Sequence, residues 1–297
     1  MKRLQTDVLD IAYVERGPIN GPPALMLHGW PDDPRGLSVV AQRLADLGFR
    51  TISPWLRGFG ETRFRSSTTL RDGRALVLAQ DAIDLLDGLG VERFMVVGHD
   101  WGGRAAYNLA ALIPDRIEMI AALAIGYAPG GGFVMPGFEQ ARRWWYQWYM
   151  NADGGAESIA ADPVGFARLQ WDTWSPSGWY AEADFTRTAV SFTNPDWLPI
   201  TLHGYRSRWL PEPVDPRYVE AERAVAETKS LRVPTLMIQG AEDGCDPPSE
   251  SENDAPWFDG DYERVVLPCV GHFPAREAPV AVTDAITSFR NRIPHVS

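Results

Sequence analysis

An aspartate stands at the centre of a turn bounded by glycines. Phe94–Val97 is an apolar run typical of a strand; it leads into Gly98-His99-Asp100-Trp101-Gly102, and Arg104–Tyr107 then has helical character. So tight a strand-to-helix turn leaves no room for side chains at its glycines and pushes the central side chain into the cleft. Asp100 is therefore predicted to be a nucleophile, and the alternative is a helix N-cap.

A carboxylate nucleophile restricts the chemistry that is available. Attack by Asp100 on an sp3 carbon forms an alkyl ester, so an epoxide ring or a carbon–halogen bond is a suitable target. Attack on an ordinary ester would form an anhydride, which argues against esterase, lipase and peptidase activities. The alkyl ester would then be hydrolysed by an activated water, while backbone N–H groups hold the oxyanion.

A second glycine-containing turn, upstream in the sequence, supports the assignment of Asp100 as a nucleophile. The strand-like run Leu25–Leu27 is followed by His28-Gly29-Trp30-Pro31. Together the two turns resemble those of the α/β-hydrolase family, whose oxyanion hole uses one N–H from this loop and one from the residue after the nucleophile. The resemblance implies that Trp30 and Trp101 supply these two donors.

In this family an acid follows the nucleophile, and a histidine follows the acid. The acid is expected after the strand-like run Pro234–Gln239, in a loop at the carboxyl edge of the sheet. Asp243 is favoured by its Gly-x-x-Asp spacing, but Glu242 and Asp246 stand close by, and Asp246 stays open as an alternative.

The histidine expected last in this order is His272, which follows the strand-like run Val265–Leu267. Of the other four histidines, His28 and His99 lie in the two turns, His203 lies in a Trp- and Tyr-rich stretch expected to form a lid, and His295 lies near the C-terminus. His272 is therefore the best candidate for the general base.

Two tyrosines carry the resemblance further, to the soluble epoxide hydrolases. Trp144–Tyr149 contains Tyr-Gln followed by an aromatic pair, and Leu202–Arg206 ends in Tyr-Arg, as in the two lid segments of that family. The likeness implies that Tyr146 and Tyr205 protonate the alkoxide that forms when an epoxide opens. A phenol has a pKa suited to that task.

The predicted function is hydrolysis of an epoxide to a vicinal diol through an alkyl ester on Asp100, with water activated by His272 and Asp243. A haloalkane dehalogenase is the first alternative, since it would use the same aspartate and could hold a halide with the indole N–H of Trp101. A ligand-binding protein without turnover is the second, because the fold alone does not exclude it.

The elements that must position these residues alternate between short strands and helices, which predicts an α/β fold with a mostly parallel sheet and helices on both faces. Strands are expected at residues 10–15, 24–28, 50–54, 93–98, 119–125, 235–239 and 263–267, and helices at 37–47, 76–89, from about 101, and at 280–292. Residues 129–228 are rich in Trp and Tyr and are broken by prolines. We therefore expect an α/β-hydrolase core at 1–128 and 229–297 with a helical cap, or lid, at 129–228.

The composition of the chain limits the classes of partner and ligand that it is expected to bind. The net charge is −11, from 28 Lys and Arg against 39 Asp and Glu, and such a surface repels phosphate backbones and anionic lipid. Cys245 and Cys269 have no CxxC spacing, and the sequence contains no ligand cluster or phosphate-cradling loop, so no metal or cofactor is predicted. Without an apolar run of about 18 residues, no membrane span is expected. The sequence predicts a cytoplasmic monomer or homodimer that acts on a small apolar epoxide.

Overall fold

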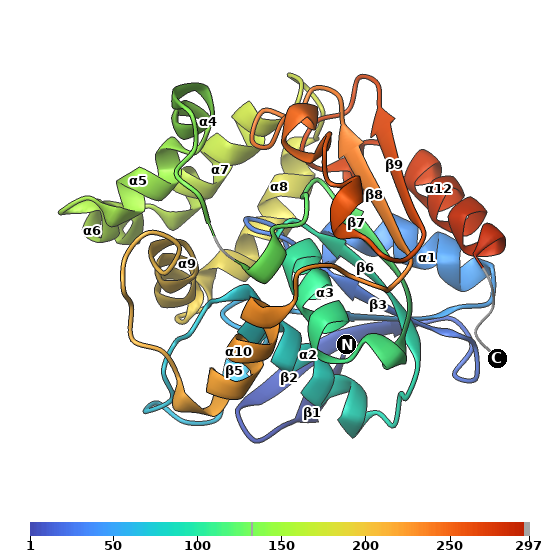
Figure 1. The fold of residues 1–297 in the computed structure, drawn as a ribbon. Helices are drawn as coiled ribbons and strands as arrows, with labels where there is room; N and C mark the ends of the chain where they lie inside the picture. The colour runs from blue at the N-terminus through green and yellow to red at the C-terminus, as the bar shows by residue number, and fades with distance from the viewer. Residues whose placement is uncertain (132, 294–297) are drawn as a thin grey trace.

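The computed structural model describes residues 1–131 and 133–293. In these residues a nine-stranded sheet has the order β1-β2-β4-β3-β6-β7-β8-β9, and β5 pairs with β2 (Figure 1). The strands are β1 (Lys2–Gln5), β2 (Leu9–Arg16), β3 (Pro23–Leu27), β4 (Arg50–Pro54), β5 (Arg63–Phe64), β6 (Phe94–His99), β7 (Ile117–Leu123), β8 (Thr235–Gly240) and β9 (Tyr262–Leu267).

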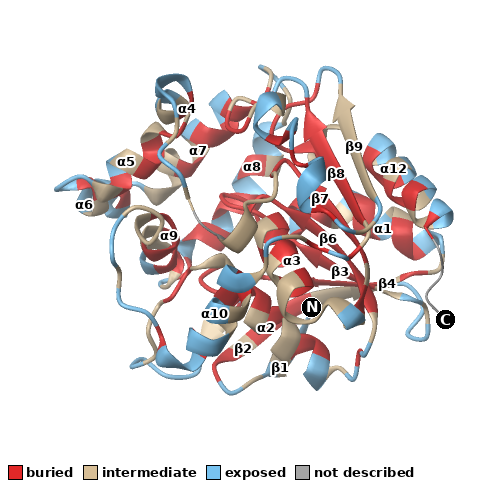
Figure 2. Ribbon diagram, in the orientation of Figure 1, coloured by how far each residue is buried: buried red, intermediate tan, exposed pale blue. Residues whose placement is uncertain are grey.

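The sheet is parallel from β4 through β9, and β2 runs antiparallel to β1, β4 and β5. Figure 2 shows that its central strands are buried, and every residue of β6 and β8 is buried. A parallel sheet covered on both faces requires such continuous apolar strands. The mostly parallel sheet expected from the sequence is thereby confirmed.

Successive side chains of β6 enter two different hydrophobic cores. Phe94 and Val96 pack with α2 (Ala75–Gly88) and α3 (Trp101–Leu112), whereas Met95 and Val97 pack with α1 (Ser38–Asp46) and α12 (Pro279–Arg292). Because neighbouring strand residues point to opposite faces, the two helix pairs cover the two faces of the sheet (Figure 1). The predicted layer architecture is confirmed.

The chain between β7 and β8 is helical. It contains α4 (Phe138–Arg143), α5 (Trp145–Asn151), α6 (Gly155–Ala161), α7 (Pro163–Trp174), α8 (Glu182–Ala189), α9 (Trp197–Arg206) and α10 (Val219–Glu227). Figure 1 shows α4–α7 and α9 gathered at one side of the sheet, whereas α10 contacts α2 and α3. The division into a core and a cap at residues 129–228 stays a prediction.

Strand β7 differs from the expected 119–125, because it begins at Ile117 and ends at Leu123. Ala124 has φ 59, a left-handed conformation that turns the chain out of the strand. The helix expected at 37–47 forms over Ser38–Asp46, after a 3-10 turn at Pro34–Leu37. None of the helices in the described ranges combines the length and the apolar character that a membrane-spanning helix needs.

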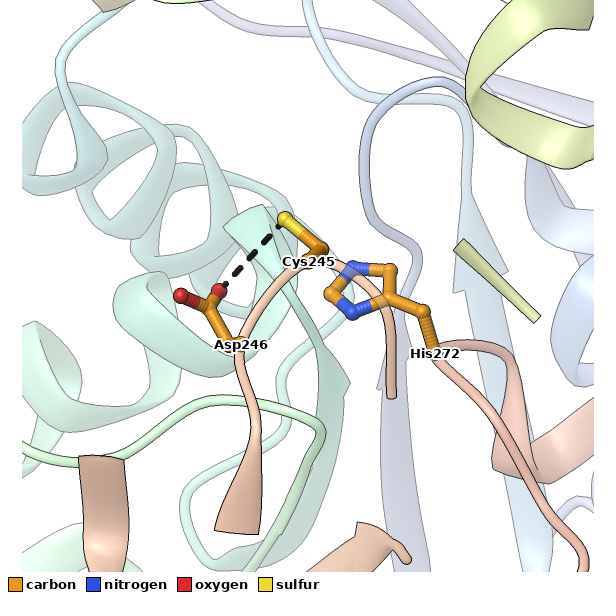
Figure 3. A group of neighbouring side chains, drawn as sticks. All are labelled: Cys245, Asp246 and His272. Atoms are coloured by element: carbon orange, nitrogen blue, oxygen red, sulfur yellow. Dashed lines mark hydrogen bonds between the residues drawn. The ribbon is translucent and has the colours of Figure 1, made fainter. Parts of the chain in front are cut away.

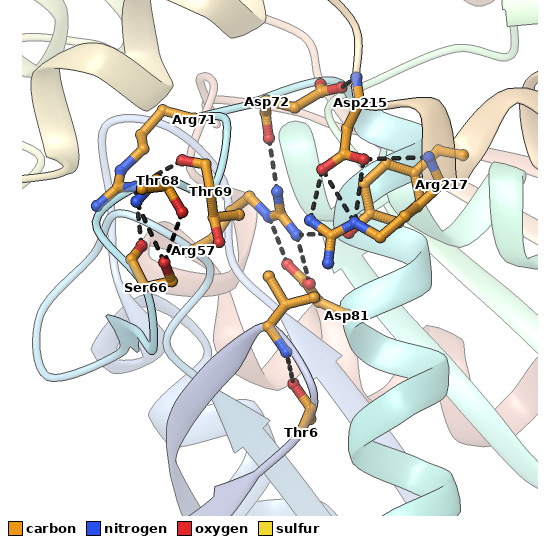
Figure 4. A network of polar contacts seen from close by, with 12 residues as sticks. Thr6, Arg57, Ser66, Thr68, Thr69, Arg71, Asp72, Asp81, Asp215 and Arg217 are labelled. Atoms are coloured by element: carbon orange, nitrogen blue, oxygen red, sulfur yellow. Dashed lines mark hydrogen bonds and ion pairs between the residues drawn. The ribbon is translucent and has the colours of Figure 1, made fainter.

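A buried arginine, Arg57, ties the loop after β4 to α2 (Figure 4). Its Nε and one Nη each donate to the carboxylate of Asp81 at 2.6 Å, and its other Nη donates to the carbonyl of Asp72 at 2.9 Å. Removing one partner of such a buried pair leaves an uncompensated charge and typically costs about 3–5 kcal/mol. The pair therefore fixes the position of α2 beside α3, the helix that follows the candidate nucleophile.

Candidate active site

The sharp turn between β6 and α3 displays Asp100, whose φ of 48 lies in the strained left-handed region. A Cβ on Gly98 would lie 2.2 Å from the carbonyl oxygen of Gly102, and one on Gly102 would lie 2.1 Å from that of Leu27. Both flanking glycines are therefore required. The Asp100 side chain makes no capping hydrogen bond to α3 in the described structure, contrary to the N-cap alternative.

The Asp100 carboxylate faces the turn that follows β3. Its Oδ1 accepts a hydrogen bond of 2.8 Å from the backbone N–H of Trp30. Trp101 is the first residue of α3, so its backbone N–H belongs to the first turn, where donors have no partner within the helix. The structure thus brings Trp30 into contact with the carboxylate and places Trp101 directly after it.

His272 lies between two carboxylates. Its Nδ1 is 2.8 Å from Oδ2 of Asp243, and its Nε2 is 3.9 Å from Oδ2 of Asp100. The other oxygen of Asp243 accepts backbone N–H bonds from Cys245 at 2.8 Å and Asp246 at 2.9 Å, which fixes the carboxylate against the imidazole. Among the described residues, the buried Nε2 has no hydrogen-bond partner.

These carboxylates determine the charge of the imidazole. Burial alone would lower the pKa of His272, but the charge and hydrogen bond of Asp243, followed by the charge of Asp100, raise it to about 9. The imidazole is therefore protonated near neutral pH.

Asp246, the alternative acid, has different partners. Its Oδ1 accepts hydrogen bonds from Nε2 of Gln140 at 3.2 Å and Nε1 of Trp144 at 3.1 Å. Burial and the nearby charge of Asp243 raise the pKa of Asp246 to about 6. The hydrogen bond to His272 is thus made by Asp243.

Cys245, Asp246 and His272 offer ligand atoms within 4.8 Å of one another (Figure 3). These groups have other partners or keep their protons. Burial and the charges of Asp246 and Asp243 hold the pKa of the Cys245 thiol well above its usual range, so the thiolate is disfavoured. The Nδ1 of His272 is also occupied by Asp243.

Three other histidines have structural partners. Nε2 of His28 accepts the backbone N–H of Leu56 at 3.1 Å, and burial lowers the pKa of His28 to about 4. His99 bonds the carbonyl of His272 at 2.7 Å, and Nδ1 of His203 accepts the N–H of Gly73 at 3.1 Å. His295 lies outside the described residues.

The two predicted tyrosines are buried and meet each other at the same tryptophan. Tyr146 on α5 and Tyr205 on α9 have ring centroids 5.2 Å apart at an interplanar angle of 89°. Trp30 stacks on Tyr146 with centroids 5.6 Å apart and meets Tyr205 edge-on at 5.1 Å. Because the N–H of Trp30 also binds Asp100, one residue joins the nucleophile to both phenols.

Two hydrogen bonds hold the segments that carry these tyrosines together. Nε of Arg206 donates to the carbonyl of Met150 at 2.8 Å, and Nε1 of Trp209 donates to Oε1 of Gln147 at 2.9 Å. Each pair joins α5 to α9 or to the turn that follows it. This connection explains why phenols 59 residues apart in the sequence share one site.

Both phenols stay protonated near neutral pH. Burial raises the pKa of Tyr146 and of Tyr205 well above the usual range, and the charge of Asp100 raises that of Tyr205 further. The hydroxyl of Tyr146 accepts from Nε2 of Gln147 at 3.2 Å and lies 3.6 Å from Sγ of Cys245. Both groups can therefore donate a proton.

Sequence reasoning missed two arginines beside this site. Arg104 stands four residues after Asp100, and Arg208 stands three residues after Tyr205. Residues four apart share a helix face, and this spacing could have drawn attention to Arg104; Arg208 lies beyond the end of α9 and had no such signal. Nothing in the sequence showed that both contact Phe133, since they are far apart along the chain.

The fold agrees with the comparison to known families. The sequence matches the family model of the alpha/beta hydrolase fold over residues 22–279. The chain therefore belongs to the α/β-hydrolase fold family.

Similar proteins span almost the whole chain. Epoxide hydrolase A of Mycobacterium tuberculosis is 25% identical over 321 aligned positions, which cover 96% of this chain and 95% of the relative. A crystal structure from Klebsiella pneumoniae, of a protein provisionally assigned as an epoxide hydrolase, is 34% identical with a TM-score of 0.92 and coverage of 98% and 97%. An epoxide hydrolase from Vigna radiata, 22% identical with a TM-score of 0.79 and coverage of 98% and 97%, shows the shared fold.

Proposed function

We propose that this protein is an epoxide hydrolase that forms an alkyl ester on Asp100. The observation that carries the proposal is the contact of Tyr146 and Tyr205 with Trp30, whose N–H binds the carboxylate. An epoxide opens to a strongly basic alkoxide that needs a proton, whereas a halide leaves without one. Two buried, protonated phenols beside a carboxylate nucleophile suit the epoxide. The names of the relatives agree with this proposal.

The first step is attack by Oδ2 of Asp100 on a ring carbon. The C–O bond of the epoxide breaks, and the alkoxide takes a proton from Tyr146 or Tyr205. The resulting tyrosinate is disfavoured by burial and recovers its proton from the His272 imidazolium. Ring opening therefore leaves the neutral imidazole that the next step requires.

Esterification also removes the negative charge of Asp100, one of the charges that hold the pKa of His272 at about 9. The pKa must then fall, and the neutral imidazole accepts a proton from water. The hydroxide adds to the ester carbonyl, and the oxyanion forms on Oδ1, which the N–H of Trp30 already contacts. We assign the second oxyanion donor to the N–H of Trp101.

The tetrahedral intermediate collapses by breaking the bond between the carbonyl carbon and Oδ2. Oδ2 departs with the product and takes the remaining water proton, which yields the diol. The Asp100 carboxylate and the His272 imidazolium are restored, so atoms and charges balance over the cycle. Asp243 holds the imidazole throughout through its bond to Nδ1.

We further propose that residues 129–228 act as a cap that supplies the ring-opening acids. This segment contains both tyrosines, and its α5 and α9 are tied together by the Arg206 and Trp209 hydrogen bonds. The core, residues 1–128 and 229–297, supplies the nucleophile, the acid and the base.

A parallel assay of a styrene-oxide-like substrate and a bromoalkane tests this proposal. We expect diol from the epoxide and little halide from the bromoalkane. Halide release without diol would instead identify a dehalogenase. Tight binding of both compounds without turnover would identify a ligand-binding protein.

A further inference from the structure

A pocket of about 250 Å³ adjoins the candidate active site. One face of α3 lines it with Trp101, Arg104 and Tyr107, and Arg208 and Phe133 lie among the residues that enclose it. Its volume is slightly below the range for drug-sized small-molecule sites, about 300–1,000 Å³. The pocket can therefore hold a small ligand that also contacts the residue next to the nucleophile.

Two arginines of this pocket have no anionic partner in the described part of the chain. Arg104 and Arg208 are partly buried, and neither side chain forms an ion pair or hydrogen bond with residues 1–131 or 133–293. Their guanidinium carbons lie 4.8 and 4.7 Å from the centre of the Phe133 ring. A third arginine of the pocket, Arg74, is instead paired with Asp72 and Glu222 at 2.8 and 2.9 Å.

This arrangement favours an anion in the pocket. Holding two guanidinium groups in one partly buried pocket costs free energy unless an anion compensates their charge. Burial and the charge of Arg208 lower the pKa of Arg104, whereas the nearby charges of Asp246 and Asp100 act in the opposite direction. The concentration of positive charge also contrasts with the net charge of −11 on the whole chain.

The arginines are connected to the candidate catalytic residues. The backbone N–H of Arg104 donates to the carbonyl of Asp100 at 2.9 Å, so the two residues lie one helical turn apart. The guanidinium carbon of Arg208 lies 4.4 Å from the ring centre of Tyr205. A ligand bound by both arginines thus lies along α3 beside Trp101, the residue that directly follows the nucleophile.

We propose that Arg104 and Arg208 bind the carboxylate of the substrate, and that the preferred substrates are epoxides of short-chain carboxylic acids. The identification of the reactive group rests on the proposed function, whereas the binding of the carboxylate rests on the pocket. Planar guanidinium groups match a carboxylate with paired hydrogen bonds. Apolar side chains such as Leu76 and Val225 line the pocket as well and suit a short carbon chain.

The kinetic test compares the terminal epoxide of hexanoic acid with its carboxamide, which has nearly the same shape but no charge. We expect the native enzyme to favour the acid in kcat/KM by about tenfold or more, mainly through KM, as for hydrogen bonds to charged groups. Arg104→Gln and Arg208→Gln should each remove most of that preference. Arg223→Gln is the matched control, because Arg223 is exposed and paired with Glu220 on α10; its acid-to-amide ratio should equal that of the native enzyme.

A binding measurement separates the pocket from the reaction. Calorimetry should detect hexanoate but not hexanamide, and both Arg104→Gln and Arg208→Gln should weaken hexanoate binding at least tenfold while circular dichroism stays native. If epoxides are hydrolysed but hexanoate does not bind, the carboxylate site is wrong and the proposed function stands. If hexanoate binds through both arginines but no epoxide is hydrolysed, the site stands and the proposed function is wrong. Tighter binding of hexyl phosphate than of hexanoate would overturn the carboxylate assignment.

Discussion

The imidazole of His272 is bonded through Nδ1 to Asp243 at 2.8 Å and presents Nε2 to Asp100 at 3.9 Å. The separation of Nε2 from Oδ2 is too long for a direct hydrogen bond. The charge of Asp100 therefore raises the pKa of His272, although the two side chains are not hydrogen-bonded to each other. The charge on Asp100 can therefore control whether His272 is protonated.

The pKa of His272 tests this control. Native enzyme should titrate at about 9 in NMR spectra of the imidazole, and Asp100→Asn, which resembles the ester in having no charge, should titrate at lower pH. Removing a nearby negative charge destabilises the imidazolium, so the sign of the shift is fixed. Glu139→Gln, an exposed change in a pair with Arg142, is the control and should leave the titration where it is. An unchanged value in Asp100→Asn would contradict the coupling.

Replacement of His272 should separate the two half-reactions. His272→Gln removes the base but keeps the nucleophile, the oxyanion donors and the phenols, so alkylation should proceed and hydrolysis should stall. Intact-mass measurement should show an increase equal to the whole epoxide, and peptide mapping should place it on Asp100. A bromoalkane would add only its alkyl group. If no adduct accumulates from an epoxide that the native enzyme hydrolyses, the two-step covalent mechanism is wrong.

Loss of a single phenol should slow ring opening. Tyr146→Phe and Tyr205→Phe should each reduce the rate of epoxide alkylation, and the double variant should approach the loss of about 10²–10⁴-fold that is typical of general acids. Stopped-flow measurement of alkylation provides the rate. Any halide release from a bromoalkane serves as the internal control, since it needs no proton. Equal losses with both substrates would point to a packing defect.

The identity of the nucleophile has its own test. Asp100→Ala should abolish turnover, and Asp100→Ser should not yield an efficient esterase, because the activated water is aimed at the side-chain carbonyl that serine lacks. Residual activity above a few per cent in the alanine variant, measured as diol formation, would refute the assignment. Asp46→Ala, at an exposed position at the end of α1, is a suitable control for handling and assay background.

The buried pair of Arg57 and Asp81 should dominate the stability of the region around α2. Arg57→Met leaves the Asp81 carboxylate buried without its partner and should lower the free energy of unfolding by about 3–5 kcal/mol. Urea denaturation followed by circular dichroism provides the measurement. The double variant Arg57→Met, Asp81→Leu should recover much of the loss, because it removes the charge that the single change leaves unpaired. Arg142→Met breaks an exposed pair and should have little effect.

Much of this candidate site could be predicted from the sequence, because local sequence patterns determine where its residues lie. A strand followed by a glycine-bounded turn leaves few conformations for Asp100, and the order of the later loops indicates His272. Local patterns did not decide between Asp243 and Asp246 as the acid. Both residues lie in one loop, and only the backbone N–H groups of Cys245 and Asp246, which fix the Asp243 carboxylate, direct it at the imidazole.

The pocket with the two arginines could not be predicted from such local patterns. Arg104 and Arg208 are more than a hundred residues apart, and their proximity depends on how α9 and its following turn pack against α3. No local pattern encodes that packing.

The end of β7 was predicted two residues too late, because nothing in an apolar run marks Ala124 as the residue that adopts a left-handed conformation.

The hydrogen bond from the N–H of Trp30 to Oδ1 of Asp100 makes the two oxygens of the nucleophile chemically distinct. In the proposed cycle Oδ1 stays in place as the oxyanion, whereas Oδ2 leaves within the diol and the attacking water replaces it. Each diol molecule therefore carries an oxygen atom that the protein took up from water one cycle earlier. In water enriched in oxygen-18, the first diol formed by each enzyme molecule should be unlabelled at the new hydroxyl, and the isotope should first be found in Asp100.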